Sequence, residues 1–218
     1  MNADPQPSSR HPLRVLGRTS SINVRKVLWT CDELAVPYEQ EQWGSGFEPT
    51  DSPEFRALNP NAKVPVIRDG TFVLWESNTI CRYLASRERR TDLLPAAAQD
   101  RARVEQWMDW QATELNTAWR YAFMALVRNT PARPDPAAVA ASTDSWSRHM
   151  AMLDAQLAAT GDYVAGAAFT LADVVVGLST HRWFATPIER PDYRAVAAYY
   201  ERLRRRDAFD RHAQPDTP

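Results

Sequence analysis

The most informative part of this chain is the stretch NPNAKVPVI at residues 59–67, which is followed closely by LWESN at residues 74–78. Pro65 stands at the first position of an apolar strand pattern, directly after Val64, so we expect a cis peptide bond between the two. A cis bond turns the backbone N–H and C=O groups of Val64 outward. An extended peptide can then pair with them as a short added strand.

The acid-hydroxyl pair Glu76-Ser77 opens the next helical pattern. Unpaired N–H groups and the dipole at a helix N-terminus favour a carboxylate. The side chain of Glu76 is suited to an ammonium group. The ligand implied by these stretches is a small peptide that carries both a carboxylate and an amine.

Two further blocks complete the pattern, SSINVRKV at residues 20–27 and FTLAD at residues 169–173. The order and spacing of these blocks around residues 59–67 and ESNTI at residues 76–80 resemble the soluble glutathione S-transferase superfamily. The resemblance runs from about residue 13 to residue 213. It is closest to bacterial members that use a serine or threonine near the glutathione sulfur.

This resemblance implies the fold class and the domains. The expected fold is an α/β thioredoxin-like N-terminal domain followed by an all-α C-terminal domain, which together make the glutathione S-transferase fold. We expect the first domain to span residues 13–88 and the helical domain to span residues 96–213.

The local patterns agree with that order of elements. The Asp-Gly pair at residues 69–70 is a strong hairpin signal, and the proline-rich stretch 43–62 is expected to be irregular. Apolar periodicity predicts the remaining elements: strands at 13–16, 38–42, 64–67 and 72–75, and helices over apolar positions 24–34 and at 77–87, 99–128, 136–160, 170–183 and 193–206.

The composition of the chain limits the classes of partner molecule that we expect it to bind. The chain has 218 residues, is 44% hydrophobic and carries a formal net charge of −1, which gives no reason to expect nucleic acid or an anionic membrane as partner. Its two cysteines form no CxxC motif or Cys/His cluster, so we expect neither a disulfide framework nor a metal site. No apolar run approaches membrane-spanning length, and the polar first twelve residues lack the hydrophobic stretch of a signal peptide. The expected location is the cytoplasm.

The catalytic residues implied by the resemblance lie at the start of the first helix. A free thiol with a pKa near 8.5 is only about 3% thiolate at pH 7, and lowering that pKa by two units raises the fraction to about 75%. Ser21 matches the family's catalytic hydroxyl, and Asn23 matches a residue that supports the thiolate. The extra serine, Ser20, leaves the choice of hydroxyl open. A serine here also suits a simple helix cap.

The glutathione-binding residues follow from the same resemblance. Glu76 and Ser77 would hold the γ-glutamyl end, and the backbone of Val64 would pair with the cysteinyl unit. Lys63 is placed to meet the glycyl carboxylate, or is a solvated loop lysine. Trp43, in the long irregular stretch, either walls the site or anchors the loop on the domain surface.

The second substrate is expected against the helical domain. Trp110 and Glu114 share one side of the predicted helix 99–128, so we include them as acceptor-site candidates, although such aromatic residues also serve as core. In the FTLAD block, Thr170 and Asp173 fit a helix capping box, which is a structural role.

The function implied is a glutathione transferase that ionises glutathione for attack on an electrophilic, mostly apolar second substrate. Glutathione is the only cofactor expected, as a substrate, and a homodimer follows from the resemblance. One alternative is a glutathione-dependent peroxidase or disulfide reductase. Another is a non-catalytic binding protein with the same fold. The sequence does not identify the electrophile.

Overall fold

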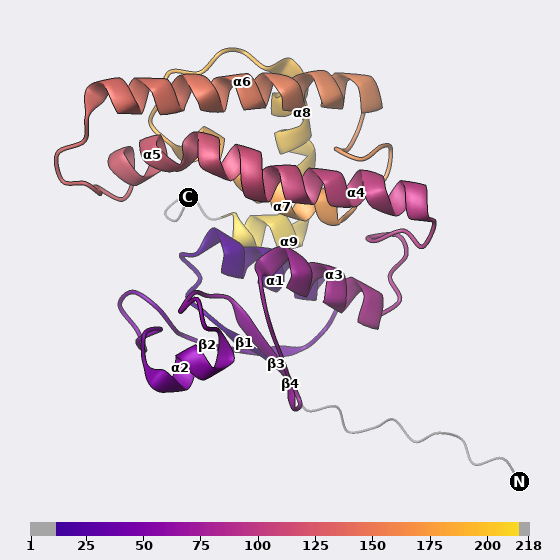
Figure 1. Ribbon diagram of the computed structural model, residues 1–218. Coiled ribbons are helices and arrows are strands. Elements are labelled where there is room, and N and C mark those ends of the chain that lie inside the picture. Colours follow the sequence, from indigo (N-terminus) through magenta and orange to yellow (C-terminus); the bar gives the residue numbers. More distant parts are fainter. Residues whose placement is uncertain (1–11, 214–218) are drawn as a thin grey trace, which may run out of the picture.

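The structure is a computed structural model that describes residues 12–213. Most of its helices lie in layers above a sheet, whereas α2 (Pro53–Leu58) lies beside the strands and packs on the other face of the sheet (Figure 1). In chain order the elements are β1 (Leu13–Leu16), α1 (Ile22–Glu33), β2 (Tyr38–Glu41), α2 (Pro53–Leu58), β3 (Val66–Asp69), β4 (Phe72–Trp75), α3 (Ser77–Arg87), α4 (Ala98–Trp110), a π-helical turn (Gln111–Leu115), α5 (Asn116–Leu126), α6 (Pro136–Thr160), α7 (Leu171–Ala185), α8 (Arg194–Leu203) and α9 (Asp207–His212).

The sheet has four strands in the order β2-β1-β3-β4, with β1 parallel to β2 and β3 antiparallel to both of its neighbours. Successive side chains of a strand point to opposite faces, so each face has its own apolar cluster. Val15 and Ile67 are fully buried in the main core with α1 and α3. Leu16 and Val66 pack on the other face, against Phe55 of α2.

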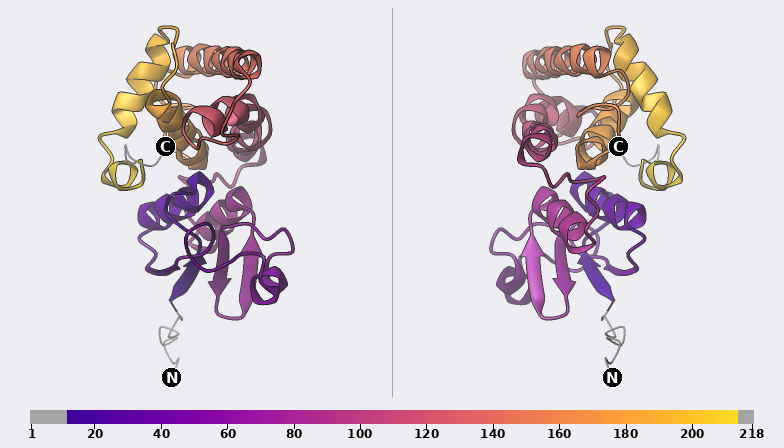
Figure 2. Two further views of the ribbon diagram at one scale, coloured as in Figure 1. Left: turned by 90° about the vertical axis from the view of Figure 1, so that its left-hand side faces the viewer. Right: turned by 90° about the vertical axis from the view of Figure 1, so that its right-hand side faces the viewer.

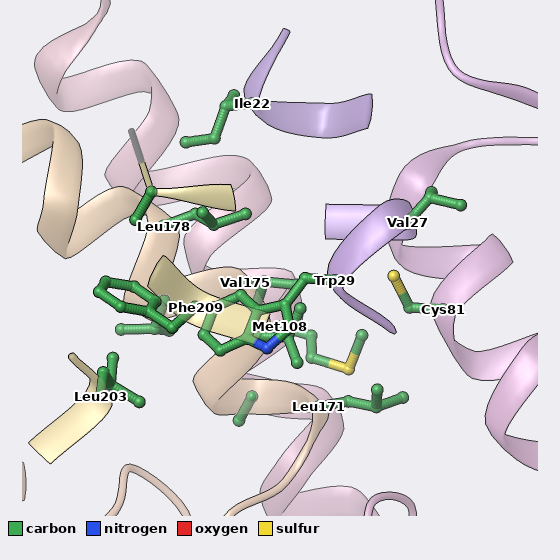
Figure 3. Packing of buried hydrophobic residues seen from close by; sticks show 14 of the residues in the cluster. Ile22, Val27, Trp29, Cys81, Met108, Leu171, Val175, Leu178, Leu203 and Phe209 are labelled. Atoms are coloured by element: carbon green, nitrogen blue, oxygen red, sulfur yellow. The ribbon is translucent and has the colours of Figure 1, made fainter. Parts of the chain in front are cut away.

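Helix α1 lies between the sheet and the helical layers (Figures 1 and 2). Trp29 is fully buried and packs against Phe209 of α9, with ring centroids 5.1 Å apart and the ring planes tilted by 59°. In Figure 3 its ring lies among Phe209, Val175 and Met108, while Val27 lies on the other side of α1, near Cys81. The first helix therefore belongs to the cores of both halves of the chain.

Helix α2 was not predicted, because residues 43–62 were expected to be irregular. Three local signals nevertheless mark its start. Ser52 accepts a hydrogen bond from the N–H of Phe55 at 3.2 Å, Pro53 occupies the first turn, and Glu54 adds an acidic side chain there. The many prolines and glycines of this stretch favour an irregular structure, so the sequence pattern did not indicate a helix.

The single helix predicted for residues 99–128 is interrupted at its centre. The π turn Gln111–Leu115 separates α4 from α5, although the two continue along one line in Figure 1. A π turn adds one residue to a helix and thereby rotates the helical residues after the turn. The predicted helix 193–206 likewise ends earlier, at Leu203, and a further short helix, α9, follows it.

The predicted bounds of α3 and α6 are confirmed. Within residues 12–213, none of the helices combines the length and the apolar character that crossing a membrane requires.

Candidate active site

Three loops meet at one end of the sheet. Leu16, Val66 and Trp75 are neighbours across β1, β3 and β4, so β1 ends, β3 begins and β4 ends at the same edge. The loops beyond that edge carry the predicted segments Ser20-Ser21, Val64-Pro65 and Glu76-Ser77.

The two serines differ in what their side chains do. Ser21 is the N-cap residue of α1, with φ −90° and ψ 120°, and its side chain makes no capping hydrogen bond within the described residues. The hydroxyl of Ser20 accepts a hydrogen bond from Nε of Arg18 at 3.0 Å, and its carbonyl accepts one from Nη2 of Arg128 at 3.0 Å. Asn23 is half-buried in the first turn of α1. Because the hydroxyl of Ser20 accepts in its bond with Arg18, both serines keep an O–H group that can donate at the helix N-terminus.

The Val64-Pro65 peptide bond is cis, which confirms the expectation from sequence. The preceding loop is held by Asn59, which is 3% exposed. Its amide donates to the carbonyl of Lys63 at 2.7 Å and accepts from the N–H of Asn61 at 3.0 Å. The backbone of Val64 makes no turn or loop hydrogen bond among the described residues, and the Lys63 side chain is exposed.

Glu76 has an unusual backbone conformation. Its φ is 73° and its ψ is 109°, which costs a non-glycine residue about 1–3 kcal/mol and occurs most often at functional sites. Its carbonyl accepts the first hydrogen bond of α3, from Ile80 at 2.8 Å, and its side chain is exposed. Ser77, at the first position of α3, is 6% exposed.

A buried polar network, missed from sequence, joins this edge to the helical layers. Lys26 is 1% exposed, and its Nζ donates to Oε1 of Gln111 at 2.6 Å and to Oδ1 of Asn78 at 3.3 Å. Gln111, in the π turn, donates in turn to Oγ of Ser179 at 2.8 Å. Burial is the main reason that the pKa of Lys26 falls to about 8. Through Asn78, the network holds the first turn of α3 in place, directly after Ser77.

The acceptor-site candidates Trp43, Trp110 and Glu114 lie in different surroundings. Trp43 packs on Phe55 with ring centroids 5.0 Å apart, on the face of the sheet covered by α2. Trp110 packs edge-on against Trp107 at 4.9 Å and lies 6.0 Å from the ring of His149 on α6. Glu114 is exposed on the π turn.

The cysteines are not suited to nucleophilic chemistry. Cys31 and Cys81 are both fully buried, and burial raises the pKa of each thiol, that of Cys81 to about 11. Thr30 donates a hydrogen bond to the sulfur of Cys81 at 3.1 Å. Among residues 12–213, no cluster of three or more His, Cys, Asp or Glu side chains is arranged to hold a metal ion.

The sheet order and the helical layers define a thioredoxin-like domain joined to an all-helical domain. The model of the glutathione S-transferase N-terminal domain matches residues 20–87, and that of the C-terminal domain matches residues 136–202. The chain belongs to the glutathione S-transferase family.

Individual relatives agree with this family. The chain is 38% identical to Glutathione S-transferase GstB of Escherichia coli over a 198-residue alignment that covers 83% of this chain and 95% of that protein. It is 33% identical to Glutathione S-transferase 3 of Zea mays over 208 residues, 92% of each chain. A theta class glutathione S-transferase of Xanthomonas axonopodis pv. citri, solved with glutathione bound, superposes with a TM-score of 0.88 at 40% identity, covering 93% of this chain and 97% of that one.

Proposed function

We propose that this chain is a glutathione transferase of the serine-site type, in which the N-terminus of α1 holds glutathione as a thiolate. The carrying observation is the meeting of the Ser21, Val64 and Glu76 loops at one edge of the sheet. The family relatives and the glutathione-bound Xanthomonas structure support it.

Recognition of glutathione uses the groups at this edge. Glu76 pairs with the γ-glutamyl ammonium, and Ser77 with the N-terminus of α3 binds the γ-glutamyl carboxylate. The backbone of Val64, beside Pro65, pairs with the cysteinyl unit, and Lys63 is placed for the glycyl carboxylate.

Calorimetry tests this assignment. Glu76→Ala and Ser77→Ala should each weaken glutathione binding by about 1–3 kcal/mol, because each removes a charge-assisted contact. Thr79→Ala, at an exposed position of α3, is the matched control. Wild-type affinity in both site variants would place glutathione elsewhere.

Activation of the thiol is assigned to Ser21, with Asn23 in support. A hydroxyl that makes no capping bond can donate to the sulfur anion, and one such bond contributes about 1.5–3 kcal/mol. Ser21→Ala should therefore raise the pKa of bound glutathione by about one unit or more while its affinity stays nearly unchanged. Ultraviolet titration of the bound thiolate measures this. If Ser20→Ala raises the pKa instead, the role belongs to Ser20.

The reaction is attack of the thiolate on an electrophilic carbon of a second substrate with an apolar body. Trp43, Trp110 and Glu114 remain candidates for acceptor contacts, although their packing ties them to other elements. A turnover screen across aryl halides, organic peroxides and mixed disulfides separates transfer from peroxidase or reductase chemistry. Glutathione binding without turnover of any of them would favour a non-catalytic binding protein.

Our proposals on location, assembly and domain bounds are based on membership of the glutathione S-transferase family. We infer a cytoplasmic homodimer, with a glutathione-binding domain at residues 13–88 and a helical domain at residues 96–213. Sedimentation equilibrium at several protein concentrations tests the assembly.

A further inference from the structure

Three arginines that are far apart in the sequence come together beside the N-terminus of α1. Arg25 belongs to the first turns of α1, Arg128 follows α5, and Arg182 lies in α7. The guanidinium carbon of Arg182 is 3.9 Å from the ring centroid of Phe123, and that of Arg128 is 5.5 Å from the same ring. Since Arg128 also donates to the carbonyl of Ser20 at 3.0 Å, these charges lie next to the proposed thiol site.

Arg25 has donors that lack acceptors. Its side chain is 3% exposed, and Nη1 donates to the carbonyl of His212 at 3.0 Å. Nε and Nη2 are buried and have no hydrogen-bond partner among the described residues. These two N–H groups lie side by side along one edge of the planar guanidinium, which is the arrangement that binds both oxygens of a carboxylate. Leaving such an edge buried and unsatisfied is costly, so it indicates an anion that the chain itself does not supply there.

The surroundings of Arg25 are cationic. Burial, and then the nearby Arg128, lower the pKa of Arg25 to about 10. Burial, and then Arg25 and Arg128, lower the pKa of Arg182 well below its usual value. Arg18, bonded to the hydroxyl of Ser20, acts on Arg128 in the same direction. The chain as a whole carries a net charge of −1, so this concentration of positive charge is a local feature.

Glutathione itself does not account for the cluster. The proposed site already gives its carboxylates partners at Ser77 and Lys63, beyond the ends of β3 and β4. Arg25 lies instead on the side of α1 that packs on α9, where it touches His212. The proposed glutathione site therefore supplies no acceptor for the two buried, unsatisfied donors of Arg25.

We propose that the arginine cluster, Arg18, Arg25, Arg128 and Arg182, binds the carboxylate of an acidic electrophilic co-substrate. This inference rests on the proposed transferase function and specifies the class of the second substrate. With an aryl chloride, the glutathione thiolate attacks the carbon that carries chlorine. A C–S bond forms, the C–Cl bond breaks, and chloride leaves with the electron pair. The thiol proton has already passed to solvent when the thiolate formed.

A matched pair of substrates tests the proposal. 4-Chloro-3,5-dinitrobenzoate carries the carboxylate, and its methyl ester is neutral. For each compound kcat/KM is divided by the rate of its uncatalysed reaction with glutathione, and the acid-to-ester ratio of these values is the readout. We expect a ratio of about ten or more in the wild type, and a fall of about tenfold to a hundredfold in Arg25→Gln, because a bidentate charge-assisted contact is lost. Arg194→Gln, at a side chain that is 93% exposed, should leave the ratio unchanged.

A second variant covers the case in which Arg25→Gln does not fold. Arg128→Gln changes an exposed position and should lower the ratio severalfold, with near-ultraviolet circular dichroism confirming the fold. Higher salt should slow the acid more than the ester, because only the acid is steered by charge. A wild type that turns over the ester but does not favour the acid, or a ratio untouched by both variants, overturns this inference alone. No turnover of either compound overturns the proposed function with it.

Discussion

Helices α1 and α7 both begin at a hydroxyl residue, but they use it differently. At α7 the expected capping box forms, and the N–H of Thr170 donates to the carboxylate of Asp173 at 2.8 Å. At α1 the side chain of Ser21 makes no capping bond within residues 12–213. A helix that leaves its cap hydroxyl unused at the edge of a sheet keeps a donor for a ligand, whereas a closed cap contributes to stability only.

The buried charges of the two helices show the same contrast. The carboxylate of Asp173 accepts four hydrogen bonds, from the backbone of Val164 and Thr170 and from the hydroxyls of Thr170 and Tyr199. The ammonium of Lys26 on α1 donates to the neutral amide oxygens of Asn78 and Gln111, with no carboxylate bonded to it in the described part of the chain. Under-satisfied polar groups therefore gather on the helix that faces the candidate site.

The largest effect is expected at the closed cap. Asp173→Ala leaves buried donors of Val164, Thr170 and Tyr199 without an acceptor, and we expect it to lower the free energy of unfolding by about 3–5 kcal/mol. Urea denaturation measures the loss. Asp100→Ala, at an exposed aspartate in the first turn of α4, should change stability by less than about 0.5 kcal/mol. A loss of stability as small as this at Asp173 would contradict the conclusion that the cap stabilises the fold.

The second prediction concerns the buried charge of α1. Because burial lowers the pKa of Lys26 from 10.5 to about 8, its contribution to stability is fully present above pH 10.5 and is lost as the pH falls through about 8. The free energy of unfolding of the wild type, minus that of Lys26→Met, should rise by about 3 kcal/mol between pH 8 and pH 10.5. Lys63→Met, at the exposed lysine, is the control. If this difference in the free energy of unfolding does not change with pH, the charged form of Lys26 is stabilised in the folded protein by more than the two amide contacts.

The third prediction tests the close approach of the two helices. A Cβ atom at Gly177 of α7 would lie 2.6 Å from Cδ1 of Leu203 and 3.3 Å from Trp29 of α1. Overpacking costs about 1–3 kcal/mol and the better helix propensity of alanine returns about 1. Gly177→Ala should therefore lower the free energy of unfolding by up to about 2 kcal/mol in thermal and urea melts. Combining it with Leu203→Ala should cost less than the sum of the two single changes.

The smallest effect is expected at the open cap. Ser21→Ala removes no capping bond, so we expect the free energy of unfolding to change by less than about 0.5 kcal/mol, whereas Thr170→Ala should cost about 1 kcal/mol. Both are measured by urea denaturation of the ligand-free protein. A loss of about 1 kcal/mol at Ser21 would make this serine an ordinary cap and weaken its assignment to the thiol.

Sequence patterns predicted most of the elements near the candidate site. Asp-Gly marked the β3–β4 hairpin, and proline after Val64 marked the cis bond. Helix α2 and the π turn escaped prediction for different reasons. The signals for α2 lay among prolines that also suit a loop. The π turn arises from tertiary contacts, since Gln111 turns inward to meet Lys26.

The charged residues of α1 were missed for a physical reason. Charged side chains in a helix normally face solvent, so the sequence predicts exposed positions for Arg25 and Lys26. Apolar residues recur on all sides of this helix, which indicated that it is buried all round and that its charges must be buried as well. Which partners they meet depends on α7, α9 and the π turn, which lie far away in sequence.

The π turn makes the packing of α5 against α7 sensitive to the number of residues in the turn. Loss of one codon there, for instance that of the exposed Ala112, would let α4 and α5 join as a single α-helix. Each residue of an α-helix turns by about 100°, so Trp119 and Phe123 would swing away from the guanidinium of Arg182 that now rests on their rings. A frame-preserving deletion in the π turn would therefore change which residues of α5 face α7 in a single evolutionary step.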